Sequence, residues 1–124
     1  MLNATRQQAE EIARDKQRTS TLLGEAMRKA EKQEGRLQSF WAELQTLFRL
    51  MQAWVRGAYR EIPWKTVVLI LAALLYFVNP MDMIPDAILG IGYLDDATVI
   101  AWVIRSLKRD IDRFVEWEKS AQPH

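Results

Sequence analysis

Four aspartates are the side chains through which this sequence could do chemistry. Asp82 and Asp86 flank Pro85, and Asp95 and Asp96 follow after a short apolar gap. Carboxylates so close to apolar segments are costly to bury unless they cap a helix, pair with a cation or bind a ligand. Their oxygens are the ligands that hard cations such as Ca²⁺ and Mg²⁺ prefer. We therefore expect the four aspartates to have a structural or a ligand-binding role.

The simpler interpretation of the aspartates is structural. Asp95 is suited to cap the N-terminus of a following helix, and Asp96 in its first turn would interact favourably with the helix dipole. Asp82 and Asp86 could close an Asx turn and cap a short helical turn. The return of the chain at this point would be shaped by four conformationally special residues: Pro80, Pro85, Gly90 and Gly92.

Other interpretations use the same carboxylates as functional groups. If the flanking helices pack antiparallel, the four aspartates could converge on a divalent cation, although their spacing does not match an EF-hand loop. Paired carboxylates also hydrolyse glycosides, but that reaction needs a substrate cleft and the flanks here are wholly aliphatic. A docking surface for a partner's basic residues is the remaining alternative. We expect no cofactor other than such a cation.

Composition excludes most enzyme chemistries. The 124 residues include no cysteine, and the single histidine is His124, the last residue. Thiol catalysis, histidine-based triads and Cys/His zinc sites therefore have no residues to use. The formal net charge is +1, whereas nucleic-acid binding needs a concentrated basic surface. We predict a protein that is not an enzyme and does not bind nucleic acid.

The segments that must position the aspartates have the patterns of helices. Residues 67–78 are an unbroken apolar run that follows Pro63. A last helix is expected to start at the Asp95-Asp96 pair and to run to about Glu118, with one apolar face. No segment has the alternation of a strand. The sequence predicts an all-α fold, a small helical bundle built on an antiparallel helical hairpin.

The first half of the chain divides into two regions. Residues 1–35 are dominated by charged and polar helix formers, and Lys16 and Thr19 interrupt their sparse apolar spacing. This region is predicted to be a long polar helix, either a coiled-coil-like appendage or a solvated, partly disordered segment. Residues 36–60 instead have the apolar spacing of an amphipathic helix. We place one helical domain at residues 36–119, with the appendage before it.

Aromatic and basic residues give the amphipathic helix two interpretations. Its apolar face could pack in the core, as could Trp102 beside the apolar face of the last helix. Alternatively, indoles and arginines could lie at a lipid headgroup boundary, with Trp64 beside Lys65 as the best-placed pair. The candidate residues for contact with a membrane or a partner are Trp41, Phe48, Trp54, Arg56, Arg60, Trp64 and Lys65.

The sequence leaves open whether the hairpin crosses a membrane. Its uninterrupted apolar run is shorter than the roughly 20 residues of a spanning helix, and Asp95-Asp96 interrupts the second segment. Basic residues nevertheless flank both segments, and residues 79–96 hold none. This charge distribution is typical of a hairpin with both ends in the cytoplasm. Insertion, peripheral contact and a fully soluble bundle all remain alternatives.

The segment from residue 75 to residue 96 resembles the signature of the YkvA-type family, a small domain of unknown function found mainly in bacteria. The pattern is an aromatic-ended apolar helix, then Pro80-Met81-Asp82-Met83-Ile84-Pro85-Asp86, then Gly92-Tyr93-Leu94-Asp95-Asp96. The match covers about residues 62–105, and Leu89 stands where the family commonly has a further proline. The resemblance implies a compact helical domain that is often predicted to be membrane-associated. It supplies no activity.

These observations lead to one main hypothesis and one alternative. The main hypothesis is a non-enzymatic, membrane-associated helical protein that serves as an interaction or scaffold module. Its charged N-terminus lacks a signal-peptide pattern, so we expect it at the inner face of the cytoplasmic membrane or, alternatively, in the cytoplasm. Expected partners are membrane lipid, a membrane protein, or a second copy bound through its helices. The alternative is a soluble helical bundle whose aspartate loop binds a divalent cation.

Overall fold

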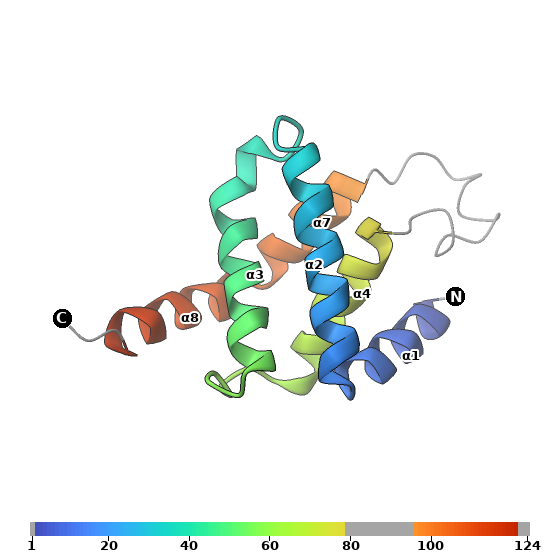
Figure 1. The fold of residues 1–124 in the computed structure, drawn as a ribbon. Coiled ribbons are helices and arrows are strands. Elements are labelled where there is room, and N and C mark those ends of the chain that lie inside the picture. The colour runs from blue at the N-terminus through green and yellow to red at the C-terminus, as the bar shows by residue number, and fades with distance from the viewer. Residues whose placement is uncertain (1, 79–95, 122–124) are drawn as a thin grey trace.

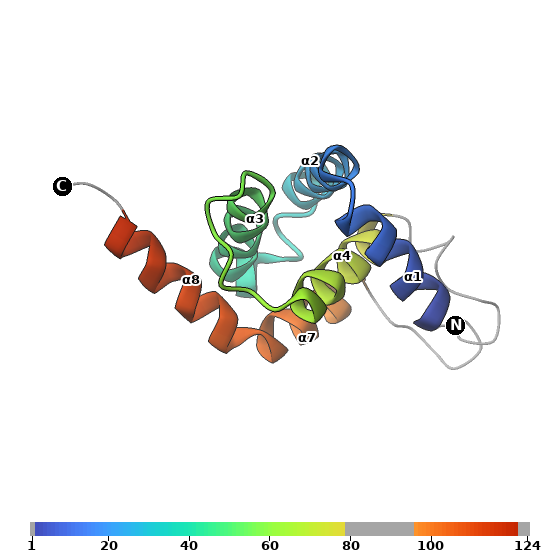
Figure 2. The same cartoon turned by 90° about the horizontal axis from the view of Figure 1, so that it is seen from below.

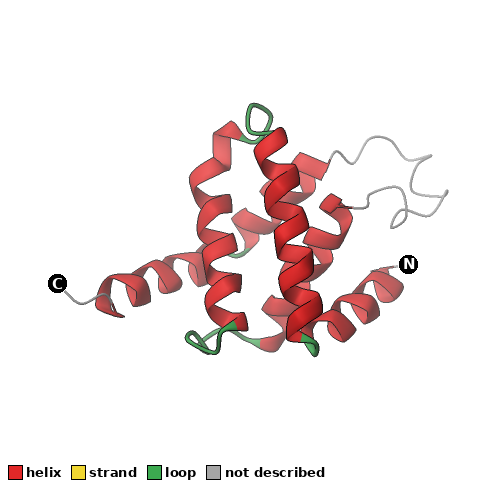
Figure 3. Cartoon of the chain, viewed as in Figure 1, coloured by secondary structure: helices red, strands yellow, loops and turns green. Residues whose placement is uncertain are grey.

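The computed structural model describes residues 2–78 and 96–121, and the regular secondary structure in these residues is entirely helical (Figures 1 and 3). The predicted all-α fold is confirmed. The α-helices are α1 (Leu2–Ala13), α2 (Lys16–Lys32), α3 (Trp41–Val55), α4 (Trp64–Val78), α7 (Asp96–Ser106) and α8 (Lys108–Ala121), and a 3₁₀ turn at Gln38–Phe40 precedes α3.

Helix α4 lies at the centre of the bundle. Its sequence from residue 67 to residue 78 carries no charge, and a helix that is apolar all round must be covered on several sides. Helices α1, α2 and α7 each pack against it (Figures 1 and 2). Its side chains Ile70, Leu71, Leu74 and Phe77 are among the most buried in the core. No helix within residues 2–78 or 96–121 combines the length and apolarity needed to cross a bilayer.

Helix α7 runs back along α4, so these two helices form the predicted antiparallel pair. The start of α4 lies beside the end of α7. This is evident from one groove, which is lined by Trp64 and Lys65 together with Ser106 and Leu107. Helix α3 stands beside α2 and closes the other side of the core (Figure 1). Most of the apolar face of α3 is buried there, as the core-packing interpretation of the amphipathic helix predicts.

The N-terminal region forms two helices, which differs from the expected single polar helix. The side chain of Asp15 accepts hydrogen bonds from the backbone N–H groups of Gln17 (3.0 Å) and Arg18 (3.2 Å), so Asp15 is the N-cap of α2. The buried hydroxyl of Thr19 donates to the carbonyl oxygen of Ile12 at 2.7 Å and ties α1 to α2. A polar residue at position 19 breaks the apolar pattern of the sequence, and its hydroxyl is used for this hydrogen bond to α1.

Both N-terminal helices pack into the core that the later helices form. Helix α1 packs against α4, and α2 packs against α4 and α3. Three fully buried alanines, Ala9, Ala26 and Ala30, allow the backbones to approach closely. The domain boundary at residue 35 stays a prediction, but α2 is not the solvated segment that its sparse apolar pattern suggests.

The prediction of one continuous helix up to about Glu118 is wrong, because the helix is interrupted at Leu107, between the end of α7 and the start of α8. The N–H of Leu107 is shared between the carbonyl oxygens of Val103 (2.9 Å) and Ile104 (3.2 Å), a bifurcation common at helix ends. Helix α7 before the break packs mainly on α4, whereas α8 after it packs on α3. The chain changes direction because its two halves have different partners.

Candidate functional site

A tight corner joins α3 to α4. Gly57 has a φ of +78°, a conformation that residues with a side chain rarely adopt. Its N–H donates to the carbonyl oxygen of Trp54 (3.0 Å), and the N–H of Ala58 donates to that of Ala53 (2.9 Å). These two bonds are the Schellman motif, which ends a helix with a glycine. The predicted hairpin glycines do not include Gly57, although a glycine just past a helix end is the usual signal of this motif.

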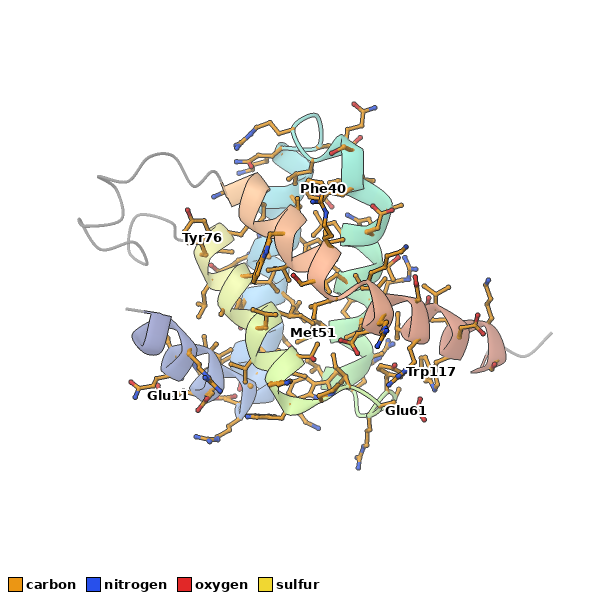
Figure 4. The ribbon with its side chains drawn as sticks, turned by 180° about the vertical axis from the view of Figure 1, so that it is seen from behind. Glu11, Phe40, Met51, Glu61, Tyr76 and Trp117 are labelled. Carbon is orange, nitrogen blue, oxygen red and sulfur yellow. The ribbon has the colours of Figure 1, made fainter. Side chains whose placement is uncertain are left out.

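Tyr59 anchors the corner to α8. The side chain is almost completely buried, and its ring centroid lies 5.1 Å from that of Phe114 and 5.1 Å from that of Trp117. Burial raises the pKa of the Tyr59 hydroxyl above its ordinary value, and the nearby carboxylate of Glu61 raises this pKa further. Figure 4 shows Trp117 of α8 and Glu61 of the corner close to each other. These aromatic contacts pack the corner against α8.

Two of the predicted tryptophans meet at this corner. Trp54 belongs to the last turn of α3, and Trp64 is the first residue of α4. Their ring centroids lie 6.4 Å apart, with the planes tilted by 52°. Trp54 is partly buried against the core, whereas Trp64 is 44% exposed. The corner therefore presents one indole to solvent and supports it with another.

The three predicted basic residues lie at the same corner, Arg56 and Arg60 between the two helices and Lys65 in the first turn of α4. The side chains of Arg56, Arg60 and Lys65 are all exposed. Within residues 2–78 and 96–121, none of them forms an ion pair, because the pairs found there involve other residues. A cation without a protein partner retains its attraction for an external anion. The structure thus brings together five of the seven predicted contact residues, the three cations with Trp54 and Trp64.

The turn between α1 and α2 lies at the same end of the bundle as this corner (Figures 1 and 2). It adds the exposed side chains of Arg14, Lys16 and Arg18. We call residues 14–18 and 56–65 the basic end. The basic end holds six basic and two acidic side chains, a net charge of +4, whereas the whole chain carries +1. The nearly neutral composition therefore conceals a strongly asymmetric charge distribution.

The remaining two predicted contact residues do not join this surface. Trp41 is partly buried at the start of α3, and α3 runs its full length before it reaches the corner. Phe48 is 1% exposed and lies in the core. Figure 4 shows Glu61 near the basic end and Tyr76 near the opposite end of α4.

The predicted aspartate cluster falls almost entirely outside the described residues. This applies to Asp82, Asp86 and Asp95, and to the hairpin residues Pro80, Pro85, Gly90 and Gly92. Asp96 is the first residue of α7, where the last helix was predicted to start. In the part of the chain that the structure describes, no three acidic, histidine or cysteine side chains gather as metal ligands would. The cation site and the capping role both stay predictions.

Trp102 is a surface residue that the sequence interpretation assigned to packing. Its side chain is 60% exposed, more than that of any other large hydrophobic residue described. The helical period could have located it, because the buried residues around it are Ile100, Val103 and Ile104 of α7 and Leu107 directly after α7. Residue 102 falls on the other side of a helix with that buried face. The interpretation that Trp102 packs beside the apolar face is wrong, because position 102 lies opposite the buried face and not at its edge.

Comparison with known proteins connects this fold to a family. The chain matches the family described as "Protein of unknown function (DUF1232)" over residues 66–102, from the first turn of α4 into α7. It is 33% identical over 102 residues to "Uncharacterized membrane protein YkvA" of Bacillus subtilis (strain 168), a match that covers 82% of this chain and 96% of that protein. No solved structure matches the chain significantly.

Proposed function

The chain belongs to the YkvA-type (DUF1232) family, and from this premise we propose a non-enzymatic protein that docks peripherally on an anionic membrane through its basic end. The relative from Bacillus subtilis is named a membrane protein. That name supports membrane association and leaves the mode of contact open. The proposed contact is the basic end, with Trp64 at the lipid boundary.

The observation that carries the proposal is an exposed indole beside cations that have no ion-pair partner in the described part of the chain. Trp64 is 44% exposed, and Lys65 follows it directly. Indole rings prefer the headgroup level of a bilayer. Each Lys or Arg near an anionic leaflet contributes about 1 kcal/mol of attraction. Because both kinds of group lie at one end of the bundle, their contributions favour the same orientation on the membrane.

Docking of this kind requires no helix that crosses the bilayer. An interfacial anchor buries its apolar side chains only about 5–10 Å deep, at the boundary between headgroups and acyl chains. One indole is a weak anchor, so most of the binding would come from charge. The affinity should therefore fall as salt shortens the distance over which charges attract. The anionic inner face of the cytoplasmic membrane is the proposed location.

The interaction or scaffold role belongs to the same proposal. Trp102 of α7 is exposed and does not belong to the basic end. We propose this part of α7 as the contact for a membrane protein or a second copy. Sedimentation velocity of the purified protein, with Trp102→Ala as the comparison, tests self-association directly. A monomer for both proteins would exclude the second copy as the partner.

The membrane contact is tested by flotation of the purified protein with phosphatidylcholine vesicles that contain an increasing share of phosphatidylglycerol. We expect the bound fraction to rise with the anionic share and to fall with added salt. We also expect a blue shift of tryptophan fluorescence on binding, which Trp64→Phe should reduce. Equal binding to neutral and anionic vesicles, or no binding to either, would contradict the proposal.

A further inference from the structure

A groove of about 580 Å³ lies beside the first half of α4. Helix α4 forms its floor, α1 forms one side, and the junction of α7 and α8 forms the other. In Figure 2, α4 runs between α1 and α7. The apolar side chains that line the groove are Trp64, Val68, Leu69, Ala72 and Leu107. Its volume is within the range of pockets that hold small molecules.

The groove has charged residues at its rim. Arg6 and Glu10 come from α1, Lys65 from α4, and Asp110 from α8. Arg6 and Glu10 pair with each other, with Nε and Oε1 separated by 3.5 Å. Lys65 forms no ion pair with any residue that the structure describes, Asp110 included. Asp110 is not in an ion pair either, so the rim offers one cation, Lys65, and one carboxylate, Asp110, each without a direct ion-pair partner among the described residues.

The groove is continuous with the basic end. Trp64 and Lys65 belong to both: they line the groove, and they begin α4 at the corner. A lipid whose headgroup met Lys65 at the membrane surface would have its chain beside an apolar wall. Small Ala72, two turns further along α4, keeps the floor of the groove open because its side chain is only a methyl group.

We propose that this groove binds one acyl chain of an anionic phospholipid, with the phosphate against Lys65. The inference rests on the proposed function, because the lipid comes from the membrane on which the basic end docks. The apolar walls match a hydrocarbon chain, and the unpaired cation at the mouth matches a phosphate. Binding of this kind would add a specific lipid contact to an otherwise non-specific charge attraction.

The test uses a lipid that is soluble as a monomer, so that it does not depend on vesicle binding. The probe is lauroyl lysophosphatidylglycerol below its critical micelle concentration, titrated calorimetrically into the purified protein. We expect one lipid bound per chain. Ala72→Phe, which fills the groove, should weaken binding at least tenfold. Lys65→Gln should weaken it roughly fivefold, the effect of one cation near a lipid phosphate.

The matched control is Ala42→Phe, the same substitution at an exposed alanine of α3 outside the groove. It should bind the lipid as the unmodified protein does. Circular dichroism establishes whether each variant is folded. If Ala72→Phe fails to fold, a second measurement tests whether the lipid chain binds in the groove. A lysophosphatidylglycerol with a brominated chain should quench the fluorescence of the unmodified protein more than that of Trp64→Phe.

The inference would be overturned by any of the results that follow. They are absence of binding by the monomeric lipid, equal binding by Ala72→Phe in folded form, and quenching that Trp64→Phe leaves unchanged. Tighter binding of free laurate than of the lysolipid would assign the groove to fatty acids and would also overturn it. Vesicle binding without monomer binding would reject the groove and leave the docking proposal intact. Monomer binding without vesicle binding would reject docking, and with it the membrane as the source of the lipid.

Discussion

Neutralising the cations of the α3–α4 corner should weaken membrane binding by a predictable amount. The perturbation is the triple variant Arg56→Gln, Arg60→Gln and Lys65→Gln. Each cation near an anionic surface contributes about 1 kcal/mol, so the three together contribute about 3 kcal/mol. Since a tenfold change in affinity corresponds to about 1.4 kcal/mol, the apparent vesicle affinity should fall roughly 100-fold.

The structure also predicts that this variant stays folded. All three side chains are exposed, and none forms an ion pair within residues 2–78 and 96–121. Substitutions of exposed side chains that form no ion pair usually change the free energy of unfolding by less than about 0.5 kcal/mol. Urea unfolding should therefore give nearly the same midpoint for the variant as for the unmodified protein. A loss of binding in a stable variant can then be assigned to charge at the surface.

The assay is co-sedimentation with phosphatidylglycerol-containing vesicles at low and at physiological salt. The matched control removes the same number of charges at the opposite end of α2 and the turn after it, with Arg28→Gln, Lys32→Gln and Arg36→Gln (Figure 1). We expect the control to bind much more tightly than the corner variant. Equal losses in both variants would mean that net charge alone governs binding. That result would refute the reasoning that the basic end orients the protein.

Three further predictions concern the fold that presents this surface. Asp15→Ala removes the N-cap of α2 and should lower the free energy of unfolding by about 1 kcal/mol in urea titrations, whereas exposed Asp112→Ala should change it little. Thr19→Val removes the buried hydrogen bond to the Ile12 carbonyl, which keeps its bond from the Asp15 N–H (3.0 Å), and should cost about 0.5–1.5 kcal/mol in the same assay; an unchanged midpoint would mean that the Thr19 bond does not tie α1 to α2. Burial raises the pKa of Tyr59, so folding favours the protonated phenol. The contribution of Tyr59 to the free energy of unfolding is complete below the unfolded-state pKa of about 10, and it is lost as the pH rises through the higher folded-state pKa. Stability at alkaline pH should therefore fall less steeply in Tyr59→Phe, and parallel pH profiles for the two proteins would argue against this assignment.

The helical class and the central position of α4 could be predicted because they follow from hydrophobic patterning. An uncharged apolar run of this length has to be buried on several sides, and the structure surrounds it with three helices. The helix end at Gly57 could also have been predicted from the sequence, because a glycine that follows an amphipathic helix is a recognised signal of the end of that helix. Trp102 could have been placed on the surface from the helical period of its neighbours.

The two helix interruptions are harder to predict from sequence. At Leu107 the apolar period continues through the break, because Leu107 and Ile111 are both buried and the N–H of Ile111 still donates to Leu107. Only the different packing partners of α7 and α8 explain the change of direction, and these partners are tertiary. At Asp15 the capping residue is a local signal, but the hydroxyl of Thr19 is explained only when Ile12 of the preceding helix is in place.

The basic end could be predicted in part. Arg56, Arg60 and Lys65 are close in sequence, so their grouping with Trp64 needs no tertiary information. Arg14 and Lys16 join them only because α1 and α2 fold back against α4, which places their turn at the same end. A net charge of +1 gave no indication of a +4 surface, because composition does not record where charges lie.

Fractionation of cells that express the protein tests the central claim most directly. The membrane pellet is washed first with high salt and then with alkaline carbonate, and the protein is followed by immunoblot. Peripheral docking through the basic end predicts that the protein sediments with the membranes and that the washes release it. Retention through the carbonate wash would contradict peripheral docking and favour insertion, and recovery in the soluble fraction from the outset would contradict membrane association itself.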